Sequence, residues 1–227
     1  MSDLDPAMQN VTKRSRIVII PPDEEANRDL YREMRNGFDP FTLETRGWPS
    51  AIITGMSLGK IFGKQCRKSM QMTTLLRELR DEHYDVMITE NFEFCGIGLS
   101  HLIQPKAVIT VSSCSIFDLT ALQLGLPLGI TYNPVHPSYD VTSIVQRAFS
   151  VYERLREQIF LRIHMYYAQR AFREEFGPDF PDLGDLTSRS AFHFTNSEPL
   201  IDFARPVLKK IVDLGGLSIQ DAKPLDK

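Results

Sequence analysis

A chain of 227 residues is long enough for one domain with a sizeable hydrophobic core, and 42% hydrophobic with 24% charged residues is ordinary for a soluble globular protein. The net charge of -3 and the pI near 6.0 exclude the strongly basic classes that bind nucleic acid or acidic membrane surfaces. No apolar stretch of the signal-peptide kind occurs in residues 1–15, and no window predicts a membrane span.

In chain order, the sequence predicts a strand at residues 16–20, a helix at 24–36 capped by Asp23, an irregular stretch at 37–50 and a helical region after it. A strand at 85–89, a helix at 93–103 and a strand at 107–111 follow. The sequence then predicts a helix at 118–123, a strand at 128–131, a loop at 132–137, a long helical stretch from Thr142 to Gly177, and strands at 191–195 and 210–214. Strands alternate with helices, which favours a parallel α/β sheet.

The long stretch that begins at Thr142 would measure on the order of 50 Å as one straight helix, so we expect a kink or two helices there. Its charged residues are expected to form a solvated face. The clearest helical spacing elsewhere is that of Met72, Leu75, Leu76 and Leu79, which lie on one face of a helix.

Three cysteines, Cys66, Cys95 and Cys114, form no CxxC pair and leave one thiol over. This pattern favours neither a metal site nor a disulfide framework. Asn10 begins an N-glycosylation sequon, which is relevant only if the chain enters the secretory pathway.

The strand, helix and strand between residues 83 and 113 predict a right-handed βαβ unit, and Glu90 follows the first of these strands. Ligands of open α/β sheets bind beyond the carboxyl ends of the strands, so Glu90 is a candidate for a functional acid. The alternative is a carboxylate near the start of the next helix, where the helix dipole contributes roughly 0.3–1 kcal/mol. Spacing alone leaves both interpretations open.

Other motifs argue against several enzyme classes. Gly96 and Gly98 begin a GxGxxG pattern, but His101 stands where the third glycine should be, which disfavours dinucleotide binding. P-loop, GxSxG and HExxH motifs do not occur. His101 and His164 are predicted to lie in helices and His193 in a strand. His136 follows a strand in a loop, where a ligand contact and a plain loop residue are both compatible with the sequence.

Several short segments together resemble the N-terminal half of animal UDP-glycosyltransferases of the UDP-glucuronosyltransferase type. They are Tyr84-Asp85, Thr89-Glu90, Cys95-Gly96, Leu124-Gly125-Leu126-Pro127, Tyr132-Asn133-Pro134, residues 196–206 (NSEPLIDFARP) and residues 210–216 (KIVDLGG). Each segment is short, but their order and spacing are specific. The similarity extends from about Ile17 to the end of the chain.

The resemblance implies a Rossmann-like parallel sheet flanked by helices, the N-terminal lobe of a two-lobed GT-B glycosyltransferase. Residues 1–15 would be a polar leading segment, 16–216 the acceptor-binding lobe and 217–227 the start of an interlobe linker. The acceptor would be a small lipophilic molecule. The second lobe of the family binds the UDP-sugar, so no cofactor and no metal is expected in this chain, and nucleic acid is not an expected partner.

In this family a histidine takes the proton of the acceptor, an acid orients the histidine, and the sugar is transferred with inversion. Glu90 matches the position of the acid, where many members carry Asp. We expect an apolar-walled acceptor pocket at the same rim, with Ser112, Ser113, Tyr132 and His136 as its polar contacts. The resemblance also implies a place in the endoplasmic reticulum membrane or lumen.

Three features of the family pattern are not matched in this sequence: the catalytic histidine, the UDP-sugar signature, and the signal peptide with its membrane anchor. We therefore expect the chain by itself to transfer no sugar. The rival hypothesis is a non-catalytic module that binds lipophilic ligands or pairs with full-length family members. An unrelated Rossmann oxidoreductase is disfavoured by the failed GxGxxG pattern.

Overall fold

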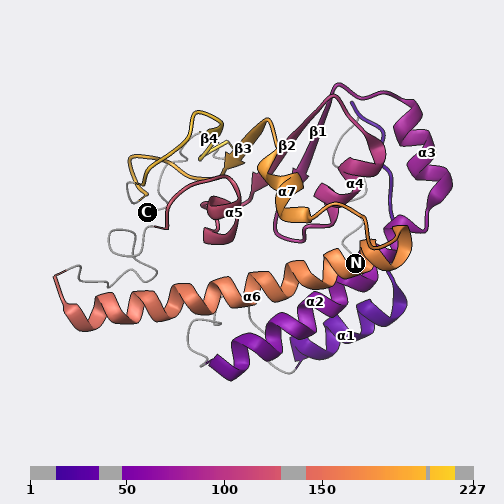
Figure 1. Cartoon of the computed structure of the whole chain (residues 1–227). Coiled ribbons are helices and arrows are strands. Elements are labelled where there is room, and N and C mark those ends of the chain that lie inside the picture. The colour runs from indigo at the N-terminus through magenta and orange to yellow at the C-terminus, as the bar shows by residue number, and fades with distance from the viewer. Residues whose placement is uncertain (1–13, 36–47, 129–141, 203–204, 218–227) are drawn as a thin grey trace, which may run out of the picture.

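The computed structural model describes residues 14–35, 48–128, 142–202 and 205–217. Its strands are β1 (Val86–Glu90), β2 (Ala107–Ser112), β3 (Phe192–Thr195) and β4 (Ile211–Asp213). Its helices are α1 (Glu24–Arg35), α2 (Trp48–Met70), α3 (Thr73–Asp81), α4 (Cys95–Ile103), α5 (Asp118–Gln123), α6 (Ile144–Phe176) and α7 (Leu183–Ser188). The strands form one sheet in the order β1-β2-β3-β4, and each neighbouring pair is parallel. The predicted parallel α/β sheet flanked by helices is confirmed (Figure 1).

The βαβ unit has the predicted arrangement. β1 and β2 are parallel neighbours, with Val86 opposite Ala107 and Glu90 opposite Val111, so Glu90 lies at the carboxyl end of the sheet. Helix α4 ends because Gln104 adopts a left-handed conformation (φ 58°) and Pro105 follows it, and a proline disfavours continuation of the preceding helix.

The predicted strand at residues 16–20 is wrong, because this segment pairs with none of the four strands. Arg16 Nη1 donates instead to Glu78 Oε1 of α3 at 2.5 Å, and Gln65 Nε2 of α2 donates to Pro21 O at 3.4 Å. These contacts hold the segment against helices, so its β-prone composition finds no ladder to join.

The first helices begin where local chemistry allows. Asp23 caps α1 as predicted, since its Oδ1 accepts a hydrogen bond from Ala26 N at 2.8 Å. The irregular stretch predicted up to residue 50 is wrong at its end, because α2 already begins at Trp48. Pro49 is tolerated there, since the first turn of a helix does not need its N–H.

Helix α6 is one continuous helix of 33 residues, so the predicted kink or break is wrong. No proline or glycine, the usual causes of a kink, occurs between Ile144 and Phe176. The cap at its start is Ser143, whose Oγ accepts from Gln146 N at 3.4 Å, rather than the predicted Thr142. Gly177 ends it as predicted. Figure 1 shows α6 running alongside α2.

The charged residues of α6 do not all face solvent, which corrects the expectation of a solvated face. Glu153, Arg154 and Arg156 are buried. Arg154 forms an ion pair with Asp118 of α5, and Arg156 forms one with Glu153. The ion pair with Asp118 places Arg154 against α5, which packs on this part of α6.

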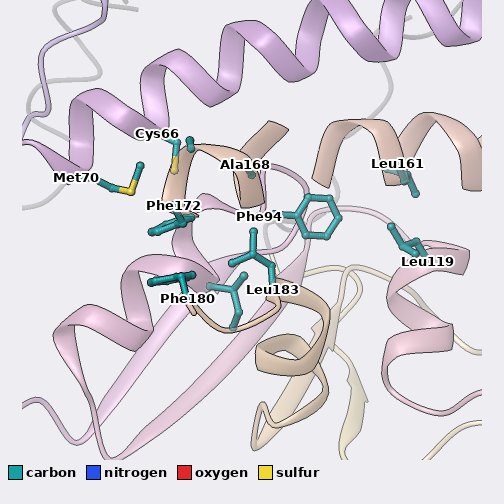
Figure 2. Close-up of a cluster of buried hydrophobic side chains, with 11 residues drawn as sticks. Cys66, Met70, Phe94, Leu119, Leu161, Ala168, Phe172, Phe180 and Leu183 are labelled. Carbon is teal, nitrogen blue, oxygen red and sulfur yellow. The ribbon is translucent and has the colours of Figure 1, made fainter. Parts of the chain in front are cut away.

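The main hydrophobic core lies between α2, α4, α5, α6 and α7 (Figure 2). It contains Cys66, Met70, Phe94, Ile97, Leu119, Leu161, Ala168, Ala171, Phe172, Phe180 and Leu183. Close approach of α2 to α6 depends on glycine, since a Cβ on Gly59 would lie 2.6 Å from Tyr167 Cδ2. Phe172 of α6 and Phe180, which follows α6, stack with their ring centroids 4.6 Å apart within this core.

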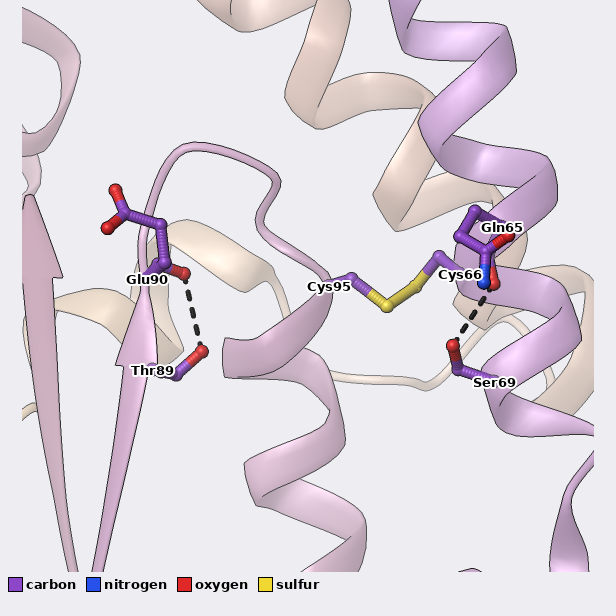
Figure 3. Close-up of a disulfide and its surroundings, with 6 residues drawn as sticks. All are labelled: Gln65, Cys66, Ser69, Thr89, Glu90 and Cys95. Atoms are coloured by element: carbon purple, nitrogen blue, oxygen red, sulfur yellow. Dashed lines mark hydrogen bonds between the residues drawn. A yellow bond between two sulfur atoms is a disulfide. The ribbon is translucent and has the colours of Figure 1, made fainter. Parts of the chain in front are cut away.

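A disulfide joins Cys66 of α2 to Cys95 at the start of α4 (Figure 3). The sequence-based expectation of no disulfide was wrong. Helix packing brings together two residues that lie 29 apart in the chain, and no spacing rule reveals that contact. Cys114 is the free thiol.

The two faces of the sheet are different. Alternation places Val86, Ile88 and Phe192 on one face, where they are 47%, 62% and 44% exposed. The opposite face carries Thr110 and His193, which are fully buried under the helices. Residues 129–141, with most of the predicted strand and loop at 128–137, lie outside the described residues, as does the sequon at Asn10.

Candidate functional site

The carboxyl ends of four parallel strands meet at one edge of the sheet. β1 ends at Glu90, β2 at Ser112, β3 at Thr195 and β4 at Asp213. Thr195 Oγ1 donates to Asp213 Oδ1 at 2.5 Å, so the last two strand ends are also joined through their side chains. This edge is where an open α/β sheet binds its ligands.

Glu90 is exposed at this edge, and Figure 3 shows its carboxylate pointing away from the disulfide. Partial desolvation by the surrounding residues raises the pKa of this carboxyl, while backbone N–H groups of Ser113, Asn91 and Phe92 act in the opposite direction. The helix dipole acts most strongly within the first turn of a helix. Helix α4 begins only at Cys95, so Glu90 lies outside that turn. The geometry therefore favours the strand-tip interpretation over the helix-start one.

The predicted polar contacts of the pocket separate into three cases. Ser113 is exposed just after β2, and its carbonyl accepts from Asn196 Nδ2 at 3.1 Å. Ser112 is fully buried, with its Oγ 3.2 Å from His193 Nε2. Tyr132 and His136 lie outside the described residues. A role in ligand binding remains a prediction for all four.

His193 belongs to a polar network inside the sheet. Its Nδ1 lies 2.8 Å from Thr110 Oγ1, which in turn lies 3.3 Å from Ser190 Oγ, and Ser112 occupies its other ring nitrogen. Burial, with a smaller contribution from Lys210, lowers the pKa of His193 to about 4. This histidine is neutral at pH 7 and has no open surface, so its hydrogen bonds join β2 to β3.

Sequence reasoning missed three titratable groups near this edge: Glu93, Cys114 and Glu157. Burial, followed by the charge of Glu90, raises the pKa of Glu93. Burial, followed by the charges of Glu90 and Glu157, raises the pKa of the Cys114 thiol. Cys114 could have been found from its place two residues after β2, whereas Glu157 lies in α6 and gives no such signal.

Glu157 connects α6 to this edge. Its Oε1 accepts from the backbone N–H of Asp118 at 3.3 Å, next to the ion pair between Asp118 and Arg154. Burial, followed by the neighbouring charge of Asp118, raises the pKa of Glu157 to about 7. A carboxyl with this pKa exchanges its proton near neutral pH, which is a frequent property of functional sites.

A hollow of about 270 Å³ opens at the carboxyl ends of β3 and β4. Its lining is Ile116, Leu126, Thr195, Ser197, Pro199, Asp202, Arg205, Val207, Ile211 and Asp213. Arg205 Nη1 donates to Ile116 O at 3.2 Å. The charge of the same guanidinium acts on Glu157 and partly offsets the rise in its pKa, so the hollow lies near Glu157. Apolar walls with a few placed polar groups are typical of small-molecule sites. In the sequence, only the family-like segment 196–206 indicated a functional role for this region.

The remaining chemistry is limited within the described residues. No cluster of three or more His, Cys, Asp or Glu side chains there is arranged to hold a metal ion. Of the histidines in the described ranges, His83 precedes β1, His101 lies late in α4 and His164 is enclosed in the core, so none stands beside Glu90. None of the described helices combines the length and apolar character needed to cross a membrane.

Comparison of the sequence with known proteins identifies its family. The family model described as "UDP-glucoronosyl and UDP-glucosyl transferase" matches residues 8–227. Human UDP-glucuronosyltransferase 3A1 is 28% identical over 211 residues, covering 87% of this chain and 38% of that protein. Human UDP-glucuronosyltransferase 3A2 is 26% identical over 206 residues, covering 88% of this chain and 38% of that protein.

A nematode relative, the putative UDP-glucuronosyltransferase ugt-47 of Caenorhabditis briggsae, is 23% identical over 198 residues, covering 84% of this chain and 36% of that protein. No solved structure matches the chain. The chain thus spans somewhat more than a third of the length of these curated relatives. Because the family model matches nearly the whole sequence, the chain belongs to the family of UDP-glucuronosyl and UDP-glucosyl transferases.

Proposed function

We propose that residues 16–216 are the acceptor-binding lobe of a UDP-glycosyltransferase of the glucuronosyltransferase type. The lobe holds a small lipophilic acceptor at the carboxyl edge of the sheet, and a UDP-sugar bound by a donor lobe supplies the sugar. The observation that carries this proposal is the position of Glu90, on the ligand-binding edge of a parallel sheet within the matched family region.

Glu90 takes the role of the orienting acid. Its carboxyl is exposed at the strand end and is supported by three backbone N–H groups, so its free oxygen can accept a hydrogen bond from a histidine N–H. None of the described histidines lies beside it, so the base that it orients is not His83, His101, His164 or His193. Ser113 and Cys114 form the rim next to it, and the hollow at β3 and β4 supplies apolar walls.

Acceptor binding is measured by titrating the purified 227-residue chain with a naphthol in a calorimeter. We expect saturable binding that Val207→Asp weakens roughly fivefold or more, because it puts a charge into the apolar wall of the hollow. Leu217→Asp, at an exposed apolar residue outside the hollow, is the control and should leave binding unchanged. Absence of binding at millimolar naphthol would refute the pocket.

Sugar transfer is tested separately, with UDP-glucose or UDP-glucuronic acid and the same naphthol. A general base must come within roughly 2.6–3.2 Å of the acceptor hydroxyl, and no described histidine stands at this edge. We therefore expect the 227-residue chain to release no UDP above background. Turnover that Glu90→Gln abolishes would show Glu90 to be the base and would refute its orienting role.

The disulfide supports the endoplasmic reticulum lumen as the location of this chain. Disulfides form and persist in oxidising compartments and are rare in the cytosol; here Cys66 belongs to the main core and the partly buried Cys95 packs against it. Peptide mapping without reduction, on protein trapped with an alkylating agent in its own cells, should recover Cys66 joined to Cys95. Recovery of both as alkylated thiols would contradict a lumenal location.

The exposed apolar face of the sheet favours a second function, association with another family member. Parallel sheets are normally covered on both faces, yet Val86 and Ile88 of β1 and Phe192 of β3, which lie on the same face, are exposed among the described residues. Light scattering after size exclusion should show self-association of the chain that Ile88→Lys abolishes and Ile144→Lys, at an exposed helix residue away from the sheet, leaves intact. A monomer at all concentrations would contradict self-pairing.

A further inference from the structure

A second hollow lies away from the sheet, where the start of α1 and the C-terminal halves of α2 and α6 come together. Its volume is about 490 Å³. Figure 1 shows these three helices side by side beneath the sheet. Lys64 and Cys66 are two residues apart in α2 and therefore point to nearly opposite sides of it, so the hollow faces away from the disulfide.

Cationic side chains outnumber carboxylates in this hollow. Its charged lining consists of Lys60, Lys64, Arg67, Lys68 and Arg170 together with Asp23, Glu25 and Glu174. An excess of positive charge in one hollow is a local feature, because the chain as a whole carries a net charge of -3.

Each of the three carboxylates already has a partner. Asp23 Oδ1 caps α1, and Glu25 Oε1 lies 2.8 Å from Lys64 Nζ. Glu174 is shared by two arginines, with Arg170 Nε at 2.6 Å from its Oε1 and Arg67 paired with its other oxygen. No carboxylate within the described ranges pairs with Lys60 or Lys68.

The two unpaired lysines occupy the same helix eight residues apart, which separates their Cα atoms by about 12 Å. Their flexible stems allow both ammonium groups to converge on a ligand between them, and Arg67 adds a planar donor that matches phosphate geometry. The hollow is larger than inorganic phosphate needs, so it has room for the organic part of a phosphate-bearing molecule or for a lipid headgroup.

We propose that this hollow binds a phosphate-bearing anion, held by Lys60, Lys68 and Arg67. The site is independent of the acceptor site, because it is built from α1, α2 and α6 and includes no residue of the sheet edge. Phosphate esters in solution and acidic lipid headgroups share the chemistry that it recognises.

The test uses two probes on the purified 227-residue chain: inorganic pyrophosphate in a calorimeter, and vesicles of phosphatidylcholine with or without phosphatidylserine in a sedimentation assay. We expect saturable binding to at least one probe that weakens as salt rises from about 50 to about 300 mM. Binding to pyrophosphate alone identifies a soluble ligand, and binding to acidic vesicles alone identifies a lipid headgroup.

The double variant Lys60→Gln/Lys68→Gln should weaken that binding roughly tenfold or more, since both side chains face the anion directly. Arg77→Gln/Lys209→Gln removes the same charge from exposed positions outside the hollow and should bind like the unmodified chain. Circular dichroism confirms that both variants fold. The proposal is overturned if neither probe binds at millimolar concentration, or if the control variant loses as much affinity as the test variant.

Discussion

The two halves of α6 pack in opposite ways. The half around Ala168 and Phe172 lies in the apolar core and meets α2 at glycines, with Cα of His164 close to Gly59. The half around Arg154 and Glu157 meets α5 through buried charges, above all the ion pair with Asp118. One continuous helix thus carries a dry, closely packed interface at one end and a charged interface at the other.

Two side chains seven residues apart on this helix show what the difference means. Burial lowers the pKa of His164 to about 4 and raises the pKa of Glu157 to about 7. Both shifts favour the neutral form, because burial penalises whichever form is charged. His164 is enclosed by Phe62, Phe92 and other aromatic rings, whereas Glu157 adjoins the candidate site, so only the charged half links stability to function.

Removing one member of the buried ion pair should have the largest effect on this contrast. Arg154→Met leaves Asp118 buried without its main counterion and next to Glu157, which we expect to cost about 3–5 kcal/mol in the free energy of unfolding. Urea titration measures this loss. The double variant Arg154→Met/Asp118→Leu removes both charges and should recover most of it; an equal loss in the two variants would mean that packing, rather than charge, dominates here.

The disulfide should contribute nearly as much in the apolar half. Replacing Cys66 and Cys95 by Ala releases a loop of 29 residues in the unfolded chain, which lowers the free energy of unfolding by about 3–4 kcal/mol on the chain-entropy model. Thermal unfolding with and without a reductant gives the comparison. Cys114→Ala is the matched control, because this thiol is free. It should unfold like the unmodified chain, and the reductant should lower the stability of both by the same amount.

The raised pKa of Glu157 predicts that the free energy of unfolding falls as pH rises. Its pKa rises from 4.5 to about 7 on folding, so between these values the folded state holds a proton that the unfolded state has released. Stability is therefore fully present below pH 4.5 and falls by roughly 1–3 kcal/mol as pH approaches 7. Urea titrations at pH 5 and pH 8 should show this loss, and Glu157→Gln should remove it. An unchanged slope in Glu157→Gln would assign the pH dependence to another group.

Replacing His164 should have the smallest effect on stability at pH 7, and the pH dependence that His164 causes has the opposite sign. Its pKa falls from 6.5 to about 4 on folding, so protonation of the unfolded chain lowers stability as pH drops from 6.5 to 4. His164→Phe, among aromatic neighbours, should change the free energy of unfolding at pH 7 by no more than about 1 kcal/mol and should reduce the loss in acid. A large loss at pH 7 would show that the ring nitrogens have partners that the aromatic shell conceals.

Local patterns were sufficient for elements whose signals lie within a few residues. The helix at Asp118–Gln123 has the predicted bounds, because Gly125 and Pro127 mark its end. β1, α4 and β2 follow from apolar runs and one helix stop. The short helix at Leu183–Ser188 was not predicted, since six residues give no periodicity to read.

The rest depends on contacts between distant parts of the chain. Nothing near Glu157 indicates that α5 will bury it, and nothing near Cys66 indicates that Cys95 will face it. Alternation placed His193 in a strand correctly but could not show that its polar face is the buried one, because Thr110 and Ser112 on the neighbouring strand supply its hydrogen bonds. Sequence reasoning therefore located the candidate site through Glu90 and the serines after β2, without Glu93, Glu157 or the hollow at β3 and β4.

The disulfide also has a consequence for the order of events during synthesis. Cys95 leaves the ribosome about 80 residues before the end of α6, which at roughly 5–20 residues per second is a lead of about 4–16 s. The link between α2 and α4 can therefore close before α6 exists to cover it. A nascent chain of this kind presents Gly55, Gly59 and Gly63 on a helix that is already linked to α4, so α6 docks onto a helix whose position is partly fixed.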